Sequence, residues 1–192
     1  MSKPIILLDN GHGVDTSGKR SPKWADGSQL KEWEFNRDIV KRVARALSAK
    51  SISHKILVPE EEDISLKTRC KRANKHKSAI LISIHANAGG GSGIECFTSV
   101  GDTYADRLAT IFLQTAHNAM PNVKMRYSLS DGDIDKECNF YILKHTRCPA
   151  ILTENFFMDN ETDCKFLLTD EGRDKIAGYH VDAILEMLNL YK

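Results

Sequence analysis

The sequence has 192 residues, 41% of them hydrophobic, which is enough to bury a full core, and we expect one domain over residues 1–192. Its 27 basic and 26 acidic residues give a net charge of +1, which offers no electrostatic basis for binding nucleic acid or an anionic membrane. No apolar run approaches the length of a membrane span, so we expect no integral membrane segment.

The first predicted element is a strand over residues 5–9 that ends in the turn Asn10-Gly-His-Gly13. The two glycines let the backbone fold tightly around His12. Only four consecutive apolar residues precede Asp9, too few for the apolar region of a signal peptide. The five cysteines are odd in number and lack a CxxC spacing, which is typical of reduced thiols. Both observations predict synthesis in the cytoplasm without a signal peptide.

Residues 14–29 are rich in Asp, Ser, Gly, Pro and Lys and predict a surface loop. A helix follows from Glu32, because apolar residues recur at helical spacing: Phe35, Ile39, Val40, Val43, Ala44 and Leu47. Glu32 lies in the first turn, where two interpretations compete. Its carboxylate either complements the helix dipole or projects toward the sheet edge that carries His12.

The next two elements are a short strand over residues 54–59 and a helix over residues 64–76. The helix is rich in basic residues: Lys67, Arg69, Lys71, Arg72, Lys75, His76 and Lys77. It has no interleaved aromatic residues and follows four acidic ones, so a solvated helix surface is favoured over a nucleic-acid face.

Residues 79–88 form the apolar run that we expect to be a strand buried on both faces, with His85 at its carboxyl end. In open α/β sheets ligands bind at that edge. Residues 93–100 predict a strand nearer the edge of the sheet, and residues 102–120 an amphipathic helix.

Residues 122–137 are expected to be irregular. Within them, residues 131–135 (DGDID) resemble a calcium loop, but Lys136 replaces the glycine of such a loop and Ile142 its bidentate glutamate. The sequence therefore does not predict a calcium loop of that type here.

The last elements are a short strand or extended piece over residues 140–143, a buried strand over residues 149–157 and a helix over residues 170–190. Glu154 lies near the end of the buried strand. The order of elements predicts a single-domain α/β sandwich, with a mostly parallel twisted sheet and helices on both faces. On this architecture four side chains from separate elements can converge: His12, Glu32, His85 and Glu154.

Two imidazoles and one carboxylate are the ligand set of a catalytic zinc site, which keeps its fourth position open for water. A further glutamate beside such a site could act as the general base and later protonate the leaving nitrogen. The spacing alone is weak evidence, because the two histidines are not joined in a compact motif such as HExxH.

Five short motifs resemble, in the same order, those of the zinc-dependent N-acetylmuramoyl-L-alanine amidases of the amidase-3 type. They are Asp9-Asn-Gly-His-Gly13, Glu32-Trp-Glu-Phe-Asn36, Ser83-Ile-His-Ala-Asn87, Gly93-Ile-Glu95 and Pro149-Ala-Ile-Leu-Thr-Glu154. The resemblance runs from residue 5 to about residue 188. Two departures are Asn10, where the family usually has proline, and Asn155-Phe-Phe157, which differs from the family's commoner glycine-containing sequence.

The resemblance implies a peptidoglycan hydrolase that cleaves the amide between the lactyl group of N-acetylmuramic acid and L-alanine. It implies that His12, Glu32 and His85 hold one Zn²⁺ and that Glu154 is the catalytic acid/base. Asn87 and Glu95 are expected to contact the substrate, peptidoglycan or muropeptides. Glu34 competes as the third ligand, but the family's acid stands four residues before the asparagine, here Asn36, and Glu34 would point about 200° away around the helix.

Some family members carry an inserted helix that plugs the zinc site, and the segment 120–140 is too short to hold much of one, so we expect an enzyme that is active without a protein activator. We also expect a monomer. Residues 14–29 and the segment 120–140 are expected to form the walls of the groove that grips the peptide, and deleting residues within 131–135 is expected to change the kinetics on peptidoglycan. A phage-type lytic enzyme is favoured over a bacterial one. In either case we expect the enzyme to act on the cell wall, and its export route is unknown. Two alternatives stay open: a zinc peptidase cutting within the stem peptide, and a non-catalytic wall-binding module, which would not need Glu154.

Overall fold

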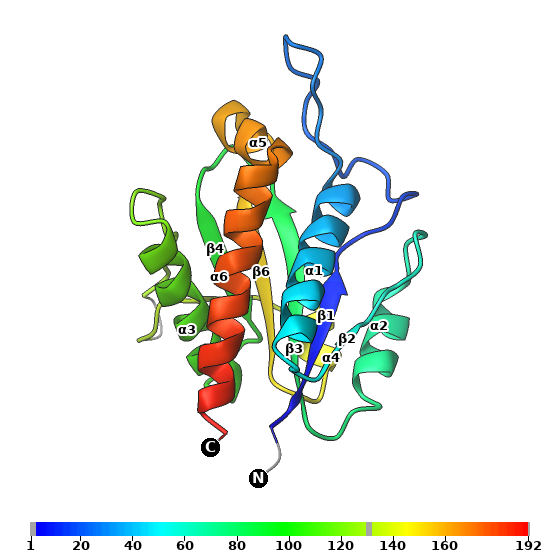
Figure 1. Cartoon of the computed structure of the whole chain (residues 1–192), viewed down its shortest axis with the longest axis vertical. Helices are drawn as coiled ribbons and strands as arrows, with labels where there is room; N and C mark the ends of the chain where they lie inside the picture. The colour runs from blue at the N-terminus through cyan, green and yellow to red at the C-terminus, as the bar shows by residue number, and fades with distance from the viewer. Residues whose placement is uncertain (1–2, 130–131, 192) are drawn as a thin grey trace.

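The computed structural model describes residues 3–129 and 132–191. Asp131 of the predicted irregular segment, and residues 1–2 and 192 of the predicted domain, lie outside the described residues. A central sheet has six strands in the order β2-β1-β3-β6-β4-β5 (Figure 1). The strands are β1 (Ile5–Asn10), β2 (His54–Ile56), β3 (Ala79–Asn87), β4 (Ile94–Thr98), β5 (Lys136–Glu137) and β6 (Ala150–Phe157).

The sheet is mostly parallel, as predicted. Strand β1 pairs in parallel with β2 and β3, β3 with β6, and β4 with β5, whereas β4 runs antiparallel to β6. Strands β1, β3 and β6 form the centre, and their near-continuous apolar composition follows from burial on both faces. Strand β4 lies near the edge, as expected, with only the two-residue β5 beyond it.

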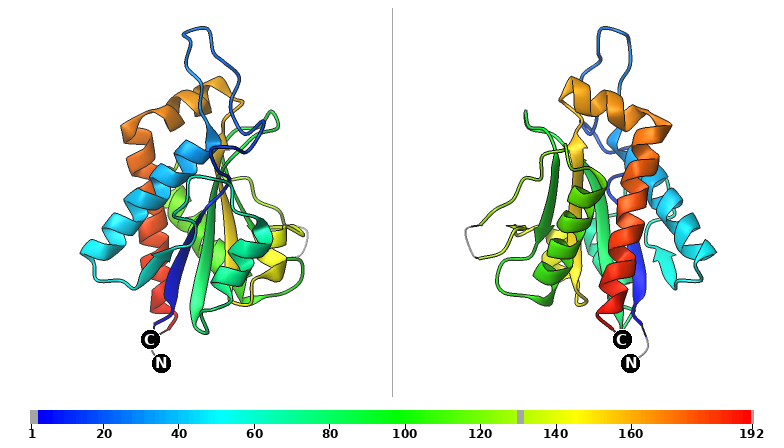
Figure 2. Two further views of the ribbon diagram at one scale, coloured as in Figure 1. Left: turned by 90° about the vertical axis from the view of Figure 1, so that its right-hand side faces the viewer. Right: turned by 60° about the vertical axis from the view of Figure 1, so that its left-hand side comes forward.

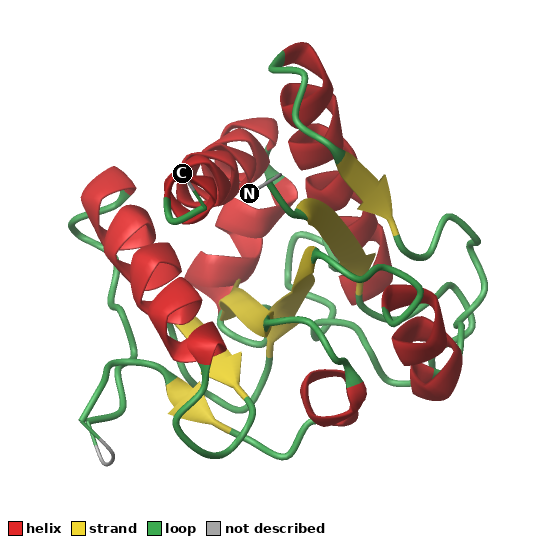
Figure 3. Cartoon of the chain, turned by 90° about the horizontal axis from the view of Figure 1, so that it is seen from below, coloured by secondary structure: helices red, strands yellow, loops and turns green. Residues whose placement is uncertain are grey.

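Helices cover both faces of the sheet, which confirms the predicted sandwich (Figures 2 and 3). One face carries α1 (Glu32–Ala49), α3 (Tyr104–Ala119) and α6 (Asp170–Asn189), with α5 (Glu161–Leu168) packed on α6. The other face carries α2 (Leu66–Ala73) and α4 (Tyr141–His145). No helix among the described residues is both long and apolar enough to cross a membrane.

Three details differ from the prediction. Residues 140–143 were expected to be extended, but helix α4 begins at Tyr141, so that prediction is wrong. A short apolar run does not distinguish a strand from one buried helical turn, and here Ile142 and Leu143 pack as a helix under the sheet. Helix α5 and strand β5 were not predicted.

Alternation along the strands places polar side chains on the face covered by α2 and α4. Leu7, Leu81 and Leu152 are buried there in the smaller apolar cluster. Two residues farther along the same strands, toward their carboxyl ends, lie Asp9, Ser83 and Glu154, and His85 follows Ser83. Because residues two apart in a strand share a face, these four polar side chains gather at one corner of the sheet.

Candidate active site

Two neighbouring parallel strands bring the two predicted histidines together. Asn10 at the end of β1 is in register with Ile84, so the turn after β1 passes beside His85 on β3. Gly11 makes this possible, because a Cβ at this position would lie 2.0 Å from the ring of His85. His12 then adopts a left-handed backbone conformation, with φ of 65°. The centroids of the two imidazole rings lie 5.1 Å apart, with the rings nearly perpendicular.

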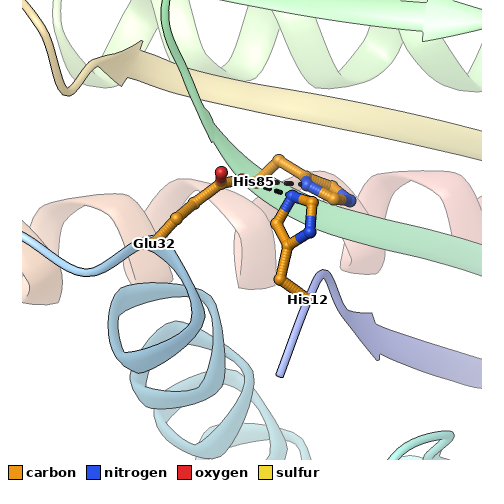
Figure 4. Close-up of side chains that lie close together, drawn as sticks. All are labelled: His12, Glu32 and His85. Carbon is orange, nitrogen blue, oxygen red and sulfur yellow. Dashed lines mark hydrogen bonds and ion pairs between the residues drawn. The ribbon is translucent and has the colours of Figure 1, made fainter. Parts of the chain in front are cut away.

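Glu32, in the first turn of α1, points its carboxylate at both rings (Figure 4). Its Oε1 lies 3.2 Å from Nε2 of His12 and 3.0 Å from Nδ1 of His85. The side chain is 2% exposed, and its buried Oε2 has no hydrogen-bond partner. Glu34 is directed elsewhere, since its side chain is 45% exposed and pairs with Lys31 at 3.1 Å. A role limited to the helix dipole does not account for the position of Glu32.

Ser83 selects the tautomer of His85. The Ser83 hydroxyl donates its one proton to Oδ2 of Asp9 at 2.6 Å, so its oxygen can only accept from Nε2–H of His85, 3.2 Å away. Neutral His85 then has a lone pair on Nδ1, and that lone pair faces the carboxylate of Glu32. Two acceptors 3.0 Å apart require a positive charge, either an additional proton or a metal ion.

The pKa shifts of Glu32 and His85 also indicate that a positive charge is favoured between these side chains. Burial raises the pKa of Glu32, but hydrogen bonding with His12 and His85 outweighs it, and the net shift is downward. Burial lowers the pKa of His85, and the carboxylates of Glu32, Glu154 and Asp9 together outweigh that effect, so the net shift is upward. The cluster of His12, Glu32 and His85 therefore favours a positive charge between the two imidazoles and the carboxylate.

The geometry fits a tetrahedral metal ion. One ligand atom from each of His12, Glu32 and His85 lies within 4.8 Å of the others. An ion with metal–ligand bonds of about 2.0–2.1 Å and tetrahedral angles separates its ligand atoms by about 3.3 Å. The observed 3.0 and 3.2 Å separations from Oε1 match that value. The three side chains could therefore hold a metal ion, and Oε2 of Glu32, which accepts no hydrogen bond, is a second oxygen of the same carboxylate.

Glu154 lies beside this group because β6 pairs with β3. His85 is in register with Glu154, and Glu95 of β4 is in register with Glu154 from the other side. Burial raises the pKa of Glu154, the charge of His85 lowers it and the charge of Glu32 raises it, so that the net pKa is about 7. Its buried Oε2 has no hydrogen-bond partner. A carboxyl group with this pKa can both take up and release a proton near neutral pH.

A cavity of about 520 Å³ lies next to His12, His85 and Glu154. Its polar wall includes His12, Lys19, His85 and Glu154, and its apolar wall includes Ile64, Leu66, Phe140, Ile142 and Leu152. The loop 14–29 contributes Lys19, whose Nζ lies 3.9 Å from Oε2 of Glu32. Of the segment 120–140, Phe140 lines the cavity and residues 132–135 do not, and the rest of this wall comes from α4 and from residues 63–66.

The two expected substrate contacts lie next to each other and outside the cavity lining. Asn87 donates from Nδ2 to Oε2 of Glu95 at 2.9 Å. Glu95 is 4% exposed and its Oε1 forms ion pairs with Arg126 and Lys136. These interactions hold the pKa of Glu95 below its usual value despite its burial, which alone raises it.

Arg69 is a residue of the site that the sequence did not reveal. Its place on a basic helix predicted a solvated surface, but Arg69 is 1% exposed and the prediction is wrong for it. Nη1 donates to Oδ1 of Asp9 and to the carbonyl oxygen of Asn10, both at 2.8 Å, and Nη2 donates to the carbonyl oxygen of His12 at 3.2 Å. Arg69 thus fixes the turn that carries His12.

Two buried amides also position the site. Asn36 donates to the carbonyl oxygen of Gly11 at 3.0 Å, which joins α1 to the turn after β1. Asn155 donates to the carbonyl oxygen of His85 at 2.8 Å and accepts from the hydroxyl of Tyr179 at 2.7 Å. Asn155 follows Glu154 directly, at the point where the sequence departs from the commoner family pattern. That departure was the one sequence signal for a positioning role of Asn155.

Comparison with known proteins agrees with the fold and identifies the family. Residues 6–186 match the N-acetylmuramoyl-L-alanine amidase family. The chain is 32% identical to the endolysin of Bacillus phage SPP1, over 100% of this chain and 68% of that protein. It is 29% identical to the N-acetylmuramoyl-L-alanine amidase CwlM of Bacillus licheniformis, over 97% of this chain and 70% of that protein.

A similar solved structure is the N-acetylmuramoyl-L-alanine amidase of Clostridium difficile 630. It superposes with a TM-score of 0.83 at 26% identity and covers 98% of both chains. The family match spans most of the sequence, and the fold agrees over nearly its whole length. The chain therefore belongs to the N-acetylmuramoyl-L-alanine amidase family.

Proposed function

We propose that this amidase binds one Zn²⁺ through His12, Glu32 and His85 and uses Glu154 as its general base and acid. The bond cleaved is the amide between the lactyl group of N-acetylmuramic acid and L-alanine of the stem peptide. The observation that carries the proposal is the convergence of the three ligand atoms within 4.8 Å, with Glu154 in register with His85.

A zinc ion held by two neutral imidazoles and one carboxylate supplies Lewis acidity toward the amide carbonyl and toward water. The chain supplies the proton transfers. Glu154, whose pKa burial raises, takes the proton of the attacking water and returns it to the nitrogen of L-alanine as the carbon–nitrogen bond breaks. The products are a muramic acid carboxylate and a free peptide amine. The cavity offers the reacting amide an apolar wall that includes Phe140, Ile142 and Leu152.

The test is release of dye from labelled sacculi together with the zinc content of the protein. Removing the metal with a chelator should abolish dye release, and restoring Zn²⁺ should restore it. His12→Ala should lose both metal and activity, whereas His117→Ala, which changes an exposed histidine on α3, should keep both. Full dye release by a protein stripped of metal would contradict the proposal.

Mass spectrometry of the digested muropeptides identifies the bond. Cleavage at the lactyl amide exposes the amine of L-alanine and leaves an intact muramic acid carboxylate. A new amine farther along the stem peptide would identify a zinc peptidase instead. Binding to sacculi without any new amine would identify a wall-binding module.

We also propose Asn87 and Glu95 as residues that contact the glycan or peptide next to the reacting amide. Glu95 lies one strand from Glu154 in register, which supports this position. Asn87→Ala should raise KM for sacculi more than it lowers kcat. An unchanged KM would mean that Asn87 and Glu95 support β4 and do not contact the substrate.

The cellular setting proposed is lysis of the cell wall by a monomeric enzyme made in the cytoplasm. The similarity to a phage endolysin supports this proposal. Expression inside a susceptible bacterium should cause lysis only after the membrane is permeabilised. Lysis without permeabilisation would indicate that the enzyme crosses the membrane by an export route of its own. Light scattering after size exclusion gives the mass, which for a monomer is 21.5 kDa.

A further inference from the structure

Three carboxylates gather away from the active site, on the sheet face that α3 covers. They belong to Asp106 in the first turn of α3 and to Asp133 and Asp135 in the segment before β5. One oxygen of each lies within 4.8 Å of the others. None of the three forms an ion pair with a Lys or Arg among residues 3–129 and 132–191. The group therefore concentrates negative charge without a protein cation.

Asp135 is the buried member of the group. It is 1% exposed, and the hydroxyl of Thr98 donates to its Oδ2 at 2.7 Å. Its Oδ1 is buried and has no hydrogen-bond partner among the described atoms. Burial raises the pKa of Asp135, the hydroxyl of Thr98 lowers it, and the neighbouring carboxylates of Asp133 and Asp106 raise it, so that the net pKa is about 7. An unpartnered buried carboxylate oxygen beside two other carboxylates lacks a counter-charge.

Asp106 retains coordinating capacity in this arrangement. Its Oδ2 accepts from the backbone N–H of Thr103 at 2.6 Å and its Oδ1 from the Thr103 hydroxyl at 3.0 Å, which forms the cap of α3. Each carboxylate oxygen has two lone pairs, so one on each remains. The cap holds the side chain of Asp106 in place, so this side chain needs little rearrangement to bind an ion.

We propose that Asp106, Asp133 and Asp135 bind one calcium ion. All the available ligands are oxygens, which favours a hard cation over zinc. Ca²⁺ bonds oxygen at about 2.4 Å, so its ligand oxygens lie up to about 4.8 Å apart, whereas the shorter bonds of Mg²⁺ demand tighter octahedral geometry. The site is not an EF-hand, because its third protein ligand comes from α3 instead of from the loop.

Bound calcium would join the segment before β5 to α3. Lys136 follows Asp135 directly and reaches the other side of the sheet, where its Nζ lies 2.7 Å from Oε1 of Glu95. Calcium therefore stabilises the strand that supports Glu95, although it lies apart from the zinc ligands. Its main effect is on stability and not on the chemical step.

The test is calorimetric titration of the zinc-loaded protein with CaCl2 at pH 7.5, with thermal unfolding at the same concentrations. The zinc-loaded form is used so that His12, Glu32 and His85 are already occupied. One calcium ion should bind, and Tm should rise by about 5 °C when calcium is 100-fold above its Kd. Asp133→Asn and Asp135→Asn should each weaken binding by roughly 10-fold or more, since ligand charge sets calcium affinity.

Asp102→Asn is the matched control, because Asp102 is an exposed aspartate just before α3, and it should bind calcium as the wild type does. Asp133 is only half-buried, so Asp133→Asn decides the result even if Asp135→Asn fails to fold. The proposal is overturned if wild-type protein gives neither binding heat nor a Tm shift, or if Asp133→Asn binds calcium as tightly. It is also overturned if Tm rises between pH 8 and pH 6 without any response to calcium, because a proton shared between the carboxylates then supplies the charge.

Discussion

Asp9 and Ser83 face each other in register across β1 and β3, and the Ser83 hydroxyl donates to Oδ2 of Asp9 at 2.6 Å. This hydrogen bond leaves Ser83 able to act toward His85 only as an acceptor, and it directs the lone pair of Nδ1 toward Glu32. Partners of this kind orient a metal-binding histidine and raise its affinity for the ion.

We expect Ser83→Ala to weaken zinc binding by about 10–100-fold, because His85 loses the acceptor that fixes its tautomer. Competition with a chromogenic chelator measures the affinity directly, apart from activity. Ser17→Ala, at an exposed serine of the loop 14–29, is the control and should match the wild type. Unchanged zinc affinity in Ser83→Ala would show that Nδ1 is presented without this hydrogen bond.

Glu32 and Glu34 provide a paired test of the metal ligands. Glu32→Gln removes the charge that faces both imidazoles, so the purified variant should contain little or no zinc. Glu34→Gln changes only an exposed ion pair with Lys31, so zinc content and Tm should stay near the wild-type values. Atomic absorption on both proteins measures the metal, and zinc loss in Glu34→Gln instead would reverse the assignment.

Glu154→Gln should lower kcat by roughly 10²–10⁴-fold, because glutamine cannot carry the proton from water to the leaving nitrogen. Zinc content and binding to sacculi should be retained, since Glu154 is not one of the three grouped ligand residues. Turnover comes from the dye-release rate and binding from a pull-down with sacculi. A variant that turns over at the wild-type rate would assign the proton transfers to another group.

Arg69→Ala should destabilise the fold by about 3–5 kcal/mol, because it leaves the buried carboxylate of Asp9 without its cation. Denaturation with urea gives the free energy of unfolding. Lys71→Ala, at an exposed position of the same helix, should change it by no more than about 0.5 kcal/mol. Equal effects of the two substitutions would contradict the role of Arg69 in holding the turn of His12.

His180 should make the fold sensitive to acid. Burial lowers the pKa of His180 from 6.5 to about 4, so below pH 6.5 the unfolded chain binds a proton that the folded chain does not. Stability is therefore lost as pH falls, by about 2 kcal/mol between pH 7 and pH 5. Glu154 and Asp135 act in the opposite direction, because their raised pKa values make the folded chain bind protons first.

Comparing His180→Gln with the wild type isolates the contribution of the histidine. The variant should lose less stability than the wild type over the same pH range, as measured by urea denaturation at pH 7, 6 and 5. Parallel pH profiles for the two proteins would mean that His180 does not cause the loss.

Much of the architecture could be predicted because its signals are local. The apolar runs of β1, β3 and β6 and the helical spacing after Glu32 each lie within one segment, and family motifs marked four side chains for convergence. Helix α5 also had a local signal that was missed: Asn160 caps it by accepting from the N–H of Asp163. Helix α4 has five residues, too few for a period to be measured.

Arg69 could not be predicted, because its burial depends on acceptors far away in the sequence. On its own helix it is one of several basic residues, and only the folded chain places the Asp9 carboxylate and the Asn10 and His12 carbonyl oxygens around it. The pairing of Ser83 with Asp9 is hidden in the same way, since it follows from the register of two strands 74 positions apart.

The pairing of His85 with Glu154 gives the reaction centre an unusual kind of rigidity. The backbone ladder between two interior strands sets the spacing of their Cα atoms, so the two strands cannot move apart at this point without breaking hydrogen bonds of the core. Any movement that admits a bulky glycan or lets a peptide leave must therefore come from the surrounding loops. Substitutions that loosen the loop 14–29 should alter the rate of substrate exchange and leave the proton transfer itself unaltered.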